Sequence, residues 1–95
     1  MQEFLPLGLL ARAELYRGRG DLERARRDID AALTIAARGG MGLHQADGHL
    51  ASARLHLARG AQDEARRSLA TARAMIERMG YHRRDGEVAE LERML

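Results

Sequence analysis

The sequence predicts an all-α fold in a single domain, and three observations carry this prediction. Alanine, leucine, arginine and glutamate, which all favour helices, make up more than half of the 95 residues. Aromatic residues account for only 3% of the chain, and valine and threonine are scarce, which argues against a β-sandwich. Glycines recur at regular intervals and divide the chain into segments of helical length.

The composition also excludes several classes of protein. Cysteine is absent, so neither a disulfide framework nor a cysteine-based zinc site can form. No apolar stretch approaches the roughly 18 residues of a membrane span, and Met1-Gln2-Glu3 lacks the basic start of a signal peptide. The net charge is +2, and the 16 basic residues, all arginines, are interspersed with 14 acidic ones. We therefore expect a cytoplasmic protein without a membrane partner.

Five helices are predicted between glycine-containing breaks. The breaks fall at four places: Gly18-Arg19-Gly20, Gly39-Gly40-Met41-Gly42, Gly60 and Gly80. Between them, apolar residues recur three and four positions apart, which is the spacing of one helix face. This pattern predicts helices over residues 6–18, 21–38, 43–59, 61–79 and 85–95. Asp21 is predicted to cap the second helix and Asp85 the fifth.

The first two predicted helices repeat in the next two after a shift of 40 residues. Positions 5–40 align with 45–80 without a gap, and 13 of the 36 pairs are identical. The identical pairs include two at the breaks, Gly20/Gly60 and Gly40/Gly80. A helix pair that repeats at a fixed period is typical of an α-solenoid. We therefore predict one domain over 1–95 that consists of repeat one (5–40), repeat two (45–80) and a C-terminal capping helix (85–95).

Small residues are predicted to let the two helices of each repeat approach closely. In repeat one these are alanines with four larger neighbours that fill the remaining space: Ala13, Ala25 and Ala32 with Leu15, Tyr16, Leu22 and Ile29. Repeat two carries the matching set: Ala53, Ala65 and Ala72 with Leu55, Leu69 and Met75. Because the side chains at a contact set the distance between helix axes, these positions are the expected core.

The residue pattern of both repeats resembles the tetratricopeptide repeat (TPR) family. In repeat one the pattern is Leu9…Ala13…Tyr16…Gly20-Asp21-Leu22…Ala25…Ile29…Ala32. In repeat two it is His49…Ala53…His56…Gly60…Ala65…Leu69…Ala72. The period of 40 is longer than the family's common 34, and looks like the longer repeats of bacterial regulators and signalling ATPases. The resemblance implies a protein–protein interaction module, as a scaffold or regulatory segment of a larger bacterial signalling protein or as a self-associating unit.

By the same resemblance, the functional surface is the concave face formed by the first helix of each repeat. Eight residues, spaced three, four and three apart in each repeat, make up this stripe: Leu7, Leu10, Glu14, Arg17, Asp47, Leu50, Arg54 and Leu57. The mixture of apolar and charged side chains suits a partner helix or an extended peptide. The alternative is that these residues pack only against the neighbouring repeat or the terminal helix.

Other functions find less support in the sequence. A basic stripe could bind nucleic acid through six arginines: Arg26, Arg27, Arg66, Arg67, Arg83 and Arg84. Acidic neighbours offset the positive charge of these arginines, so nucleic acid is only the alternative partner.

His49 and His56 are seven residues apart, whereas metal-binding pairs on a helix sit three or four apart, so no metal is expected. No nucleophile stands near a matching base, and we predict neither an enzyme nor a cofactor.

The two ends of the chain differ in how their apolar residues are covered. The last helix carries Val88, Leu91, Met94 and Leu95, which let it cover repeat two, whereas the apolar run 4–10 has no predicted cover. Solenoids generally need about three repeats. Two hypotheses follow: the chain is the C-terminal piece of a longer solenoid, or it forms a homodimer through its apolar N-terminal helix.

Overall fold

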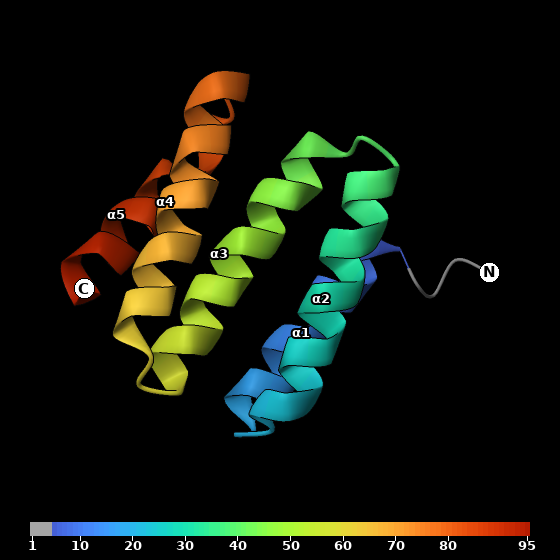
Figure 1. The fold of residues 1–95 in the computed structure, drawn as a ribbon, viewed down its shortest axis with the longest axis vertical. Coiled ribbons are helices and arrows are strands. Elements are labelled where there is room, and N and C mark those ends of the chain that lie inside the picture. Colours follow the sequence, from blue (N-terminus) through green and yellow to red (C-terminus); the bar gives the residue numbers. More distant parts are fainter. Residues whose placement is uncertain (1–4) are drawn as a thin grey trace.

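Five α-helices and one short 3₁₀ helix make up residues 5–95, the part of the chain that the computed structural model describes (Figure 1). The elements are α1 (Pro6–Gly18), α2 (Leu22–Arg38), α3 (Gly42–Ala58), α4 (Gln62–Met79), η1 (His82–Arg84) and α5 (Asp85–Met94). The all-α prediction is confirmed, and each predicted α-helix agrees with the structure to within one residue at either end. Residues 1–4, including Phe4 of the apolar run, lie outside the described residues.

The first four helices end in the same glycine turn. The glycines at these turns have φ angles between +64° and +82°: Gly20, Gly40, Gly60 and Gly80. The residue after each glycine donates its N–H to the carbonyl five residues back, as Asp21 does to Tyr16 over 2.9 Å. The equivalent bonds at the other three turns measure 2.8, 2.8 and 3.0 Å. This pattern is the Schellman motif, and its recurrence every 20 residues gives α2, α3 and α4 nearly equal lengths.

The helix α3 lies at the centre of the fold and contacts α1, α2, α4 and α5 (Figure 1). The tight turns make α1 and α2 one antiparallel hairpin and α3 and α4 another. α1 and α5 both pack against α3, whereas within residues 5–95 no contact joins α2 to α4. α1, α3 and α5 therefore form one layer, and α2 and α4 form the other.

The alanines predicted at the helix contacts are confirmed as core residues. At most 1% of the surface of each one is exposed: Ala13, Ala25, Ala32, Ala53, Ala65 and Ala72. The prediction for Leu15 is wrong, because 62% of this residue is exposed. Its repeat partner Leu55 is buried in one cluster with Ile29 of α2, and the described chain has no helix in the corresponding position beside Leu15.

The cover of the two ends also differs in detail from the prediction. Val88 and Leu91 of α5 are buried against the α4 side chains of repeat two, which confirms α5 as the covering helix, but Met94 is exposed. In the apolar N-terminal run, Leu9 and Leu10 are buried, so the prediction that this run lacks cover holds only for part of it.

Of the two predicted helix caps, one is confirmed and the other is wrong. The Asp21 side chain accepts a hydrogen bond from the Arg24 backbone N–H over 3.2 Å, as predicted for the start of α2. Asp85 is the first helical residue of α5 and not its cap, because η1 precedes the helix and Arg84 occupies the cap position. The Asp85 carboxylate instead lies 3.1 Å from Nδ1 of His82.

A polar contact ties the two helices of each hairpin at equivalent positions. In the first hairpin, the Arg12 guanidinium donates two hydrogen bonds of 2.8 Å to the buried carboxylate of Asp28. In the second, the residues 40 positions later are Ser52 and Ser68, whose hydroxyls lie 3.3 Å apart. Both repeats therefore place a matched polar pair at this point, with an ion pair in one and a neutral pair in the other.

We predict that Gly60→Ala lowers the free energy of unfolding by about 1–2 kcal/mol, because alanine is strained at positive φ. Gly18→Ala is the matched control. A methyl group at either site enters open space in the described part of the chain, but Gly18 has helical backbone. The control should therefore raise stability by up to about 1 kcal/mol. Urea denaturation measures both changes, and equal effects of the same sign would contradict the proposed role of the turn.

We also predict that Ala25→Leu lowers the free energy of unfolding by about 1–3 kcal/mol, because the added atoms overpack the contact between α1 and α2. Ala25 is fully buried, whereas Ala37 on the same helix is exposed. Ala37→Leu should therefore leave the unfolding midpoint almost unchanged. Chemical denaturation followed by circular dichroism compares the two variants, and an unchanged midpoint for Ala25→Leu would contradict the close packing of this hairpin.

Candidate functional site

All eight side chains of the predicted stripe line one or the other of two cavities that share Arg54, Glu87 and Glu90, and we call the two cavities together the groove. Its first compartment is a cavity of about 400 Å³ that includes six of them: Leu7, Leu10, Glu14, Asp47, Leu50 and Arg54. Its second compartment, about 550 Å³, includes Arg54 again together with Arg17 and Leu57. The structure thus brings the predicted residues together, while their role in binding a partner stays a prediction.

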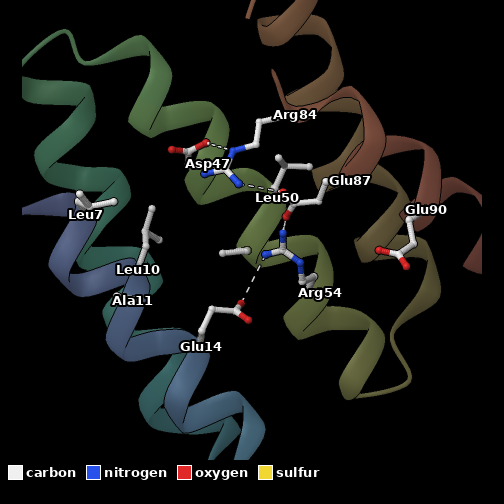
Figure 2. Close-up of a pocket in the computed structure, with 11 residues that line it drawn as sticks. Leu7, Leu10, Ala11, Glu14, Asp47, Leu50, Arg54, Arg84, Glu87 and Glu90 are labelled. Carbon is white, nitrogen blue, oxygen red and sulfur yellow. Dashed lines mark hydrogen bonds and ion pairs between the residues drawn. The ribbon is translucent and has the colours of Figure 1, made fainter. Parts of the chain in front are cut away.

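The groove also has a third wall that the sequence analysis missed. Arg84 of η1 and Glu87 and Glu90 of α5 line the first compartment (Figure 2). Glu87, Glu90, Leu91 and Met94 line the second. The 40-residue shift carries the signal that would have found three of them. It relates Glu87 to Asp47, Glu90 to Leu50, and Met94 to Arg54, so α5 presents the same positions to the groove as α3 does.

A central ion bridge joins Glu14, Arg54 and Glu87 (Figure 2), and two of these residues, Arg54 and Glu87, line both compartments. Arg54 projects from α3, and its guanidinium lies 3.4 Å from the Glu14 carboxylate of α1 and contacts the Glu87 carboxylate of α5. Arg17, one turn along α1, lies 2.7 Å from Glu14 and extends the bridge. Charged side chains therefore link α1, α3 and α5 at this point, and no two of these helices belong to the same hairpin.

A second cluster closes the end of the first compartment. The Asp47 carboxylate is almost buried, and it accepts hydrogen bonds from Nε of Arg84 over 3.0 Å and from the Tyr81 hydroxyl over 3.1 Å. Arg84 also donates to Glu87 over 2.9 Å, which joins this cluster to the central ion bridge. Asp47 thereby fixes the segment between α4 and α5 against α3.

The apolar side chains of the groove fall into two groups. Leu10 and Leu50 form the floor of the first compartment and are buried, so they belong to the core as much as to the groove. Leu7 in the first compartment and Met94 in the second are 64% and 57% exposed. These two side chains are the apolar groups that a ligand would cover.

The electrostatics of the groove follow from its ion pairs. Burial alone would raise the pKa of Glu14, but the hydrogen bond from Arg17 and the charge of Arg54 outweigh it and the pKa is lowered. Burial lowers the pKa of the Arg54 guanidinium, and the charges of Arg17 and Arg84 add to this effect. An arginine nevertheless stays protonated at any pH that leaves the protein folded.

Glu90 differs from the other charged residues of the groove. Among residues 5–95 it forms no ion pair, although it lines both compartments. The remaining charges balance: three arginines (Arg17, Arg54, Arg84) face three carboxylates (Glu14, Asp47, Glu87). The groove therefore carries one net negative charge, at Glu90.

The arginines of the predicted basic stripe do not share one surface chemistry. On α2, Arg26 pairs with Glu23 over 2.6 Å and with Asp30 over 3.0 Å, and Arg27 lies 3.5 Å from Glu23. On α4, Arg66 lies 3.4 Å from Asp63. Arg84 lies apart from the stripe arginines of α2 and α4, because it points into the groove and pairs with Asp47. The remaining two stripe residues, Arg67 and Arg83, are exposed. Most of the stripe is therefore locally neutralised.

The histidines are dispersed over the structure. His49 is half-buried on α3, and burial lowers its pKa. His44 lies 4.0 Å from Asp47, and His82 pairs with Asp85. Within residues 5–95, no three histidine, aspartate or glutamate side chains gather as a metal site would require.

The helices described are too short or too polar to cross a lipid bilayer.

Comparison with known proteins adds no further constraint on function. No protein-family model matches the sequence, and neither a curated protein nor a solved structure matches it. The functional argument therefore depends on the chemistry of the groove.

The ion pairs of the groove predict a pH dependence with a defined sign. Because the pKa of Glu14 is lower in the folded than in the unfolded chain, its stabilising effect is present above the unfolded value near 4.5 and is lost as pH falls through the folded value. Arg17→Gln should raise the pKa of Glu14, and its destabilising effect should be larger at neutral pH than in acid. Carboxyl ¹³C NMR titration measures the pKa, and an unchanged Glu14 titration would contradict this account.

Proposed function

We propose that the chain is a protein–protein interaction module whose groove binds a segment of a partner protein. The observation that carries the proposal is the form of the groove, in which two adjoining compartments each combine exposed apolar side chains with paired charges. Together they extend along α1, α3 and α5, which suits an elongated ligand such as an extended peptide or a helix.

The charges of the groove indicate what such a segment carries. Glu90 lies between the two compartments without a counter-ion from the described chain, so a basic side chain of the ligand is its natural partner. Leu7 and Met94 stand exposed in the two compartments and favour apolar side chains on either side of that basic residue. We therefore propose a ligand segment with the order apolar, basic, apolar.

We further propose that this module is a TPR-like α-solenoid in a scaffold or regulatory protein of the bacterial cytoplasm. The support is the 40-residue repeat and the family resemblance of both repeats. The new element is α5, which carries the groove positions 87, 90 and 94 in register with 47, 50 and 54 and behaves as the first helix of a third repeat. The ion pairs of Arg26, Arg27 and Arg66 weigh against the alternative of a nucleic-acid module.

The proposal is tested by selecting ligands from a phage-displayed library of random dodecapeptides. We expect enriched peptides to carry lysine or arginine between two apolar residues. Leu7→Glu and Met94→Glu should each weaken binding of an enriched peptide about tenfold or more, as expected for the loss of an apolar anchor. Isothermal titration calorimetry measures the change. Leu10 and Leu50 are unsuitable targets, because both are buried and their substitution would disturb folding.

Leu43→Glu is the matched control, since Leu43 is 48% exposed on α3 and lines neither compartment. Its peptide affinity should equal that of the unaltered chain. Glu90→Gln should weaken binding and reduce its salt dependence. Equal affinities for all variants would overturn the proposal. Micromolar binding to a random oligonucleotide that falls steeply with salt would support the nucleic-acid alternative instead.

A further inference from the structure

The face of α1 opposite α2 repeats a surface that is buried elsewhere in the same chain. Three residues of α1 are identical to those 40 positions later in α3: Gly8/Gly48, Ala11/Ala51 and Leu15/Leu55. On α3 all three are buried, and Leu55 is only 1% exposed. On α1 all three are exposed, and Leu15 is 62% exposed. We call Gly8, Ala11 and Leu15 the outer face of α1.

The helix pair α1–α2 covers the equivalent face of α3. Ala51 and Leu55 share one core cluster with Leu9 of α1 and with Ile29 and Ala32 of α2. The Gln45 side chain donates a hydrogen bond of 3.2 Å to the carbonyl of Ala36 at the end of α2. The identical residues of α3 thus have a helical hairpin as their partner.

Gly48 explains why a glycine stands at this position of the repeat. A Cβ atom there would lie 2.6 Å from Cδ2 and 2.9 Å from Cγ of Leu33, so a larger residue would require the leucine of α2 to shift. Gly8 occupies the same position in α1, where a glycine costs about 0.5–1 kcal/mol of helix stability relative to alanine. Gly8 is exposed, whereas Gly48 is buried beneath Leu33.

We propose that the outer face of α1 binds a helical hairpin of the α1–α2 kind, with a leucine seated over Gly8 and apolar side chains around Leu15. The proposal concerns a surface separate from the ligand compartments, although Ala11 borders the groove. A second copy of this chain does not present such a hairpin, because its own α3 covers the α1–α2 surface and its own α5 packs against α3–α4. The partner is therefore a helical hairpin with the residue pattern of α1 and α2, whichever polypeptide carries it.

The chain itself supplies the probe for this proposal. A second copy of residues 1–40 is fused before Met1, which preserves the 40-residue register. The chain contains no tryptophan, so Leu15→Trp in the original segment serves as the only fluorescent reporter of that face. We expect its emission to shift to shorter wavelength in the extended chain relative to the unextended one. Leu43→Trp, exposed on α3, is the control and should show no shift.

A further substitution tests whether the leucine seat is responsible. Gly8→Leu in the original segment should return the Leu15→Trp emission of the extended chain to its unextended value, because the new side chain occupies the place of the leucine. The proposal is overturned if the extension leaves the emission unchanged, or if Gly8→Leu fails to reverse the shift. It is also overturned if the unextended chain dimerises in sedimentation equilibrium and the Leu15→Trp emission shifts with concentration, because a second copy would then occupy this face.

Discussion

The left-handed glycine turn is the constraint on which the rest of the structure depends. Each of the four turns has a glycine at positive φ, and these glycines recur every 20 residues, so the chain turns at a constant interval. Because the interval is 20 residues, two helices make a repeat of 40. Any residue of α1 therefore has an equivalent in α3 with the same orientation, and the contacts of the two hairpins repeat. The alanines at the helix contacts, fully buried in both hairpins, follow from this regularity.

The groove is a consequence of the same period. Positions 7, 10 and 14 of α1 recur at 47, 50 and 54 of α3 and at 87, 90 and 94 of α5, so three helices present equivalent side chains to one surface. What differs between the repeats is the chemistry at each position. The first of these positions is leucine, aspartate and glutamate in turn, and the third is glutamate, arginine and methionine. A regular backbone thus carries an irregular pattern of charge, and this pattern distinguishes the two compartments.

Much of this could be predicted from the sequence, because helix ends and helix faces depend on local spacing. Glycine positions and apolar periodicity located every α-helix, and the stripe of α1 and α3 falls in one groove. The failures concern residues whose surroundings come from a distant part of the chain. Leu15 has the type and spacing of a core residue, but burial needs a neighbouring helix that the described chain does not place there. Asp85 is a local exception, because the 3₁₀ turn before it places Arg84 at the cap position and Asp85 inside the helix. Arg84 enters the groove because Asp47, 37 residues earlier, holds it, and local spacing carries no signal of that pair.

Under the proposed function, the central ion bridge contributes to specificity more than to stability. Placing charges in a partly buried site carries a desolvation cost that their mutual attraction only roughly offsets, so Glu14, Arg54 and Glu87 are weak evidence of a stabilising device. Apolar residues at these positions would join the two compartments into one continuous apolar surface, which would bind many apolar segments equally well. In the proposed function, the bridge keeps these charges paired and the ligand supplies a partner for Glu90. The proposed groove would then discriminate against a segment that is apolar throughout, because that segment would cover Glu90 without a counter-ion.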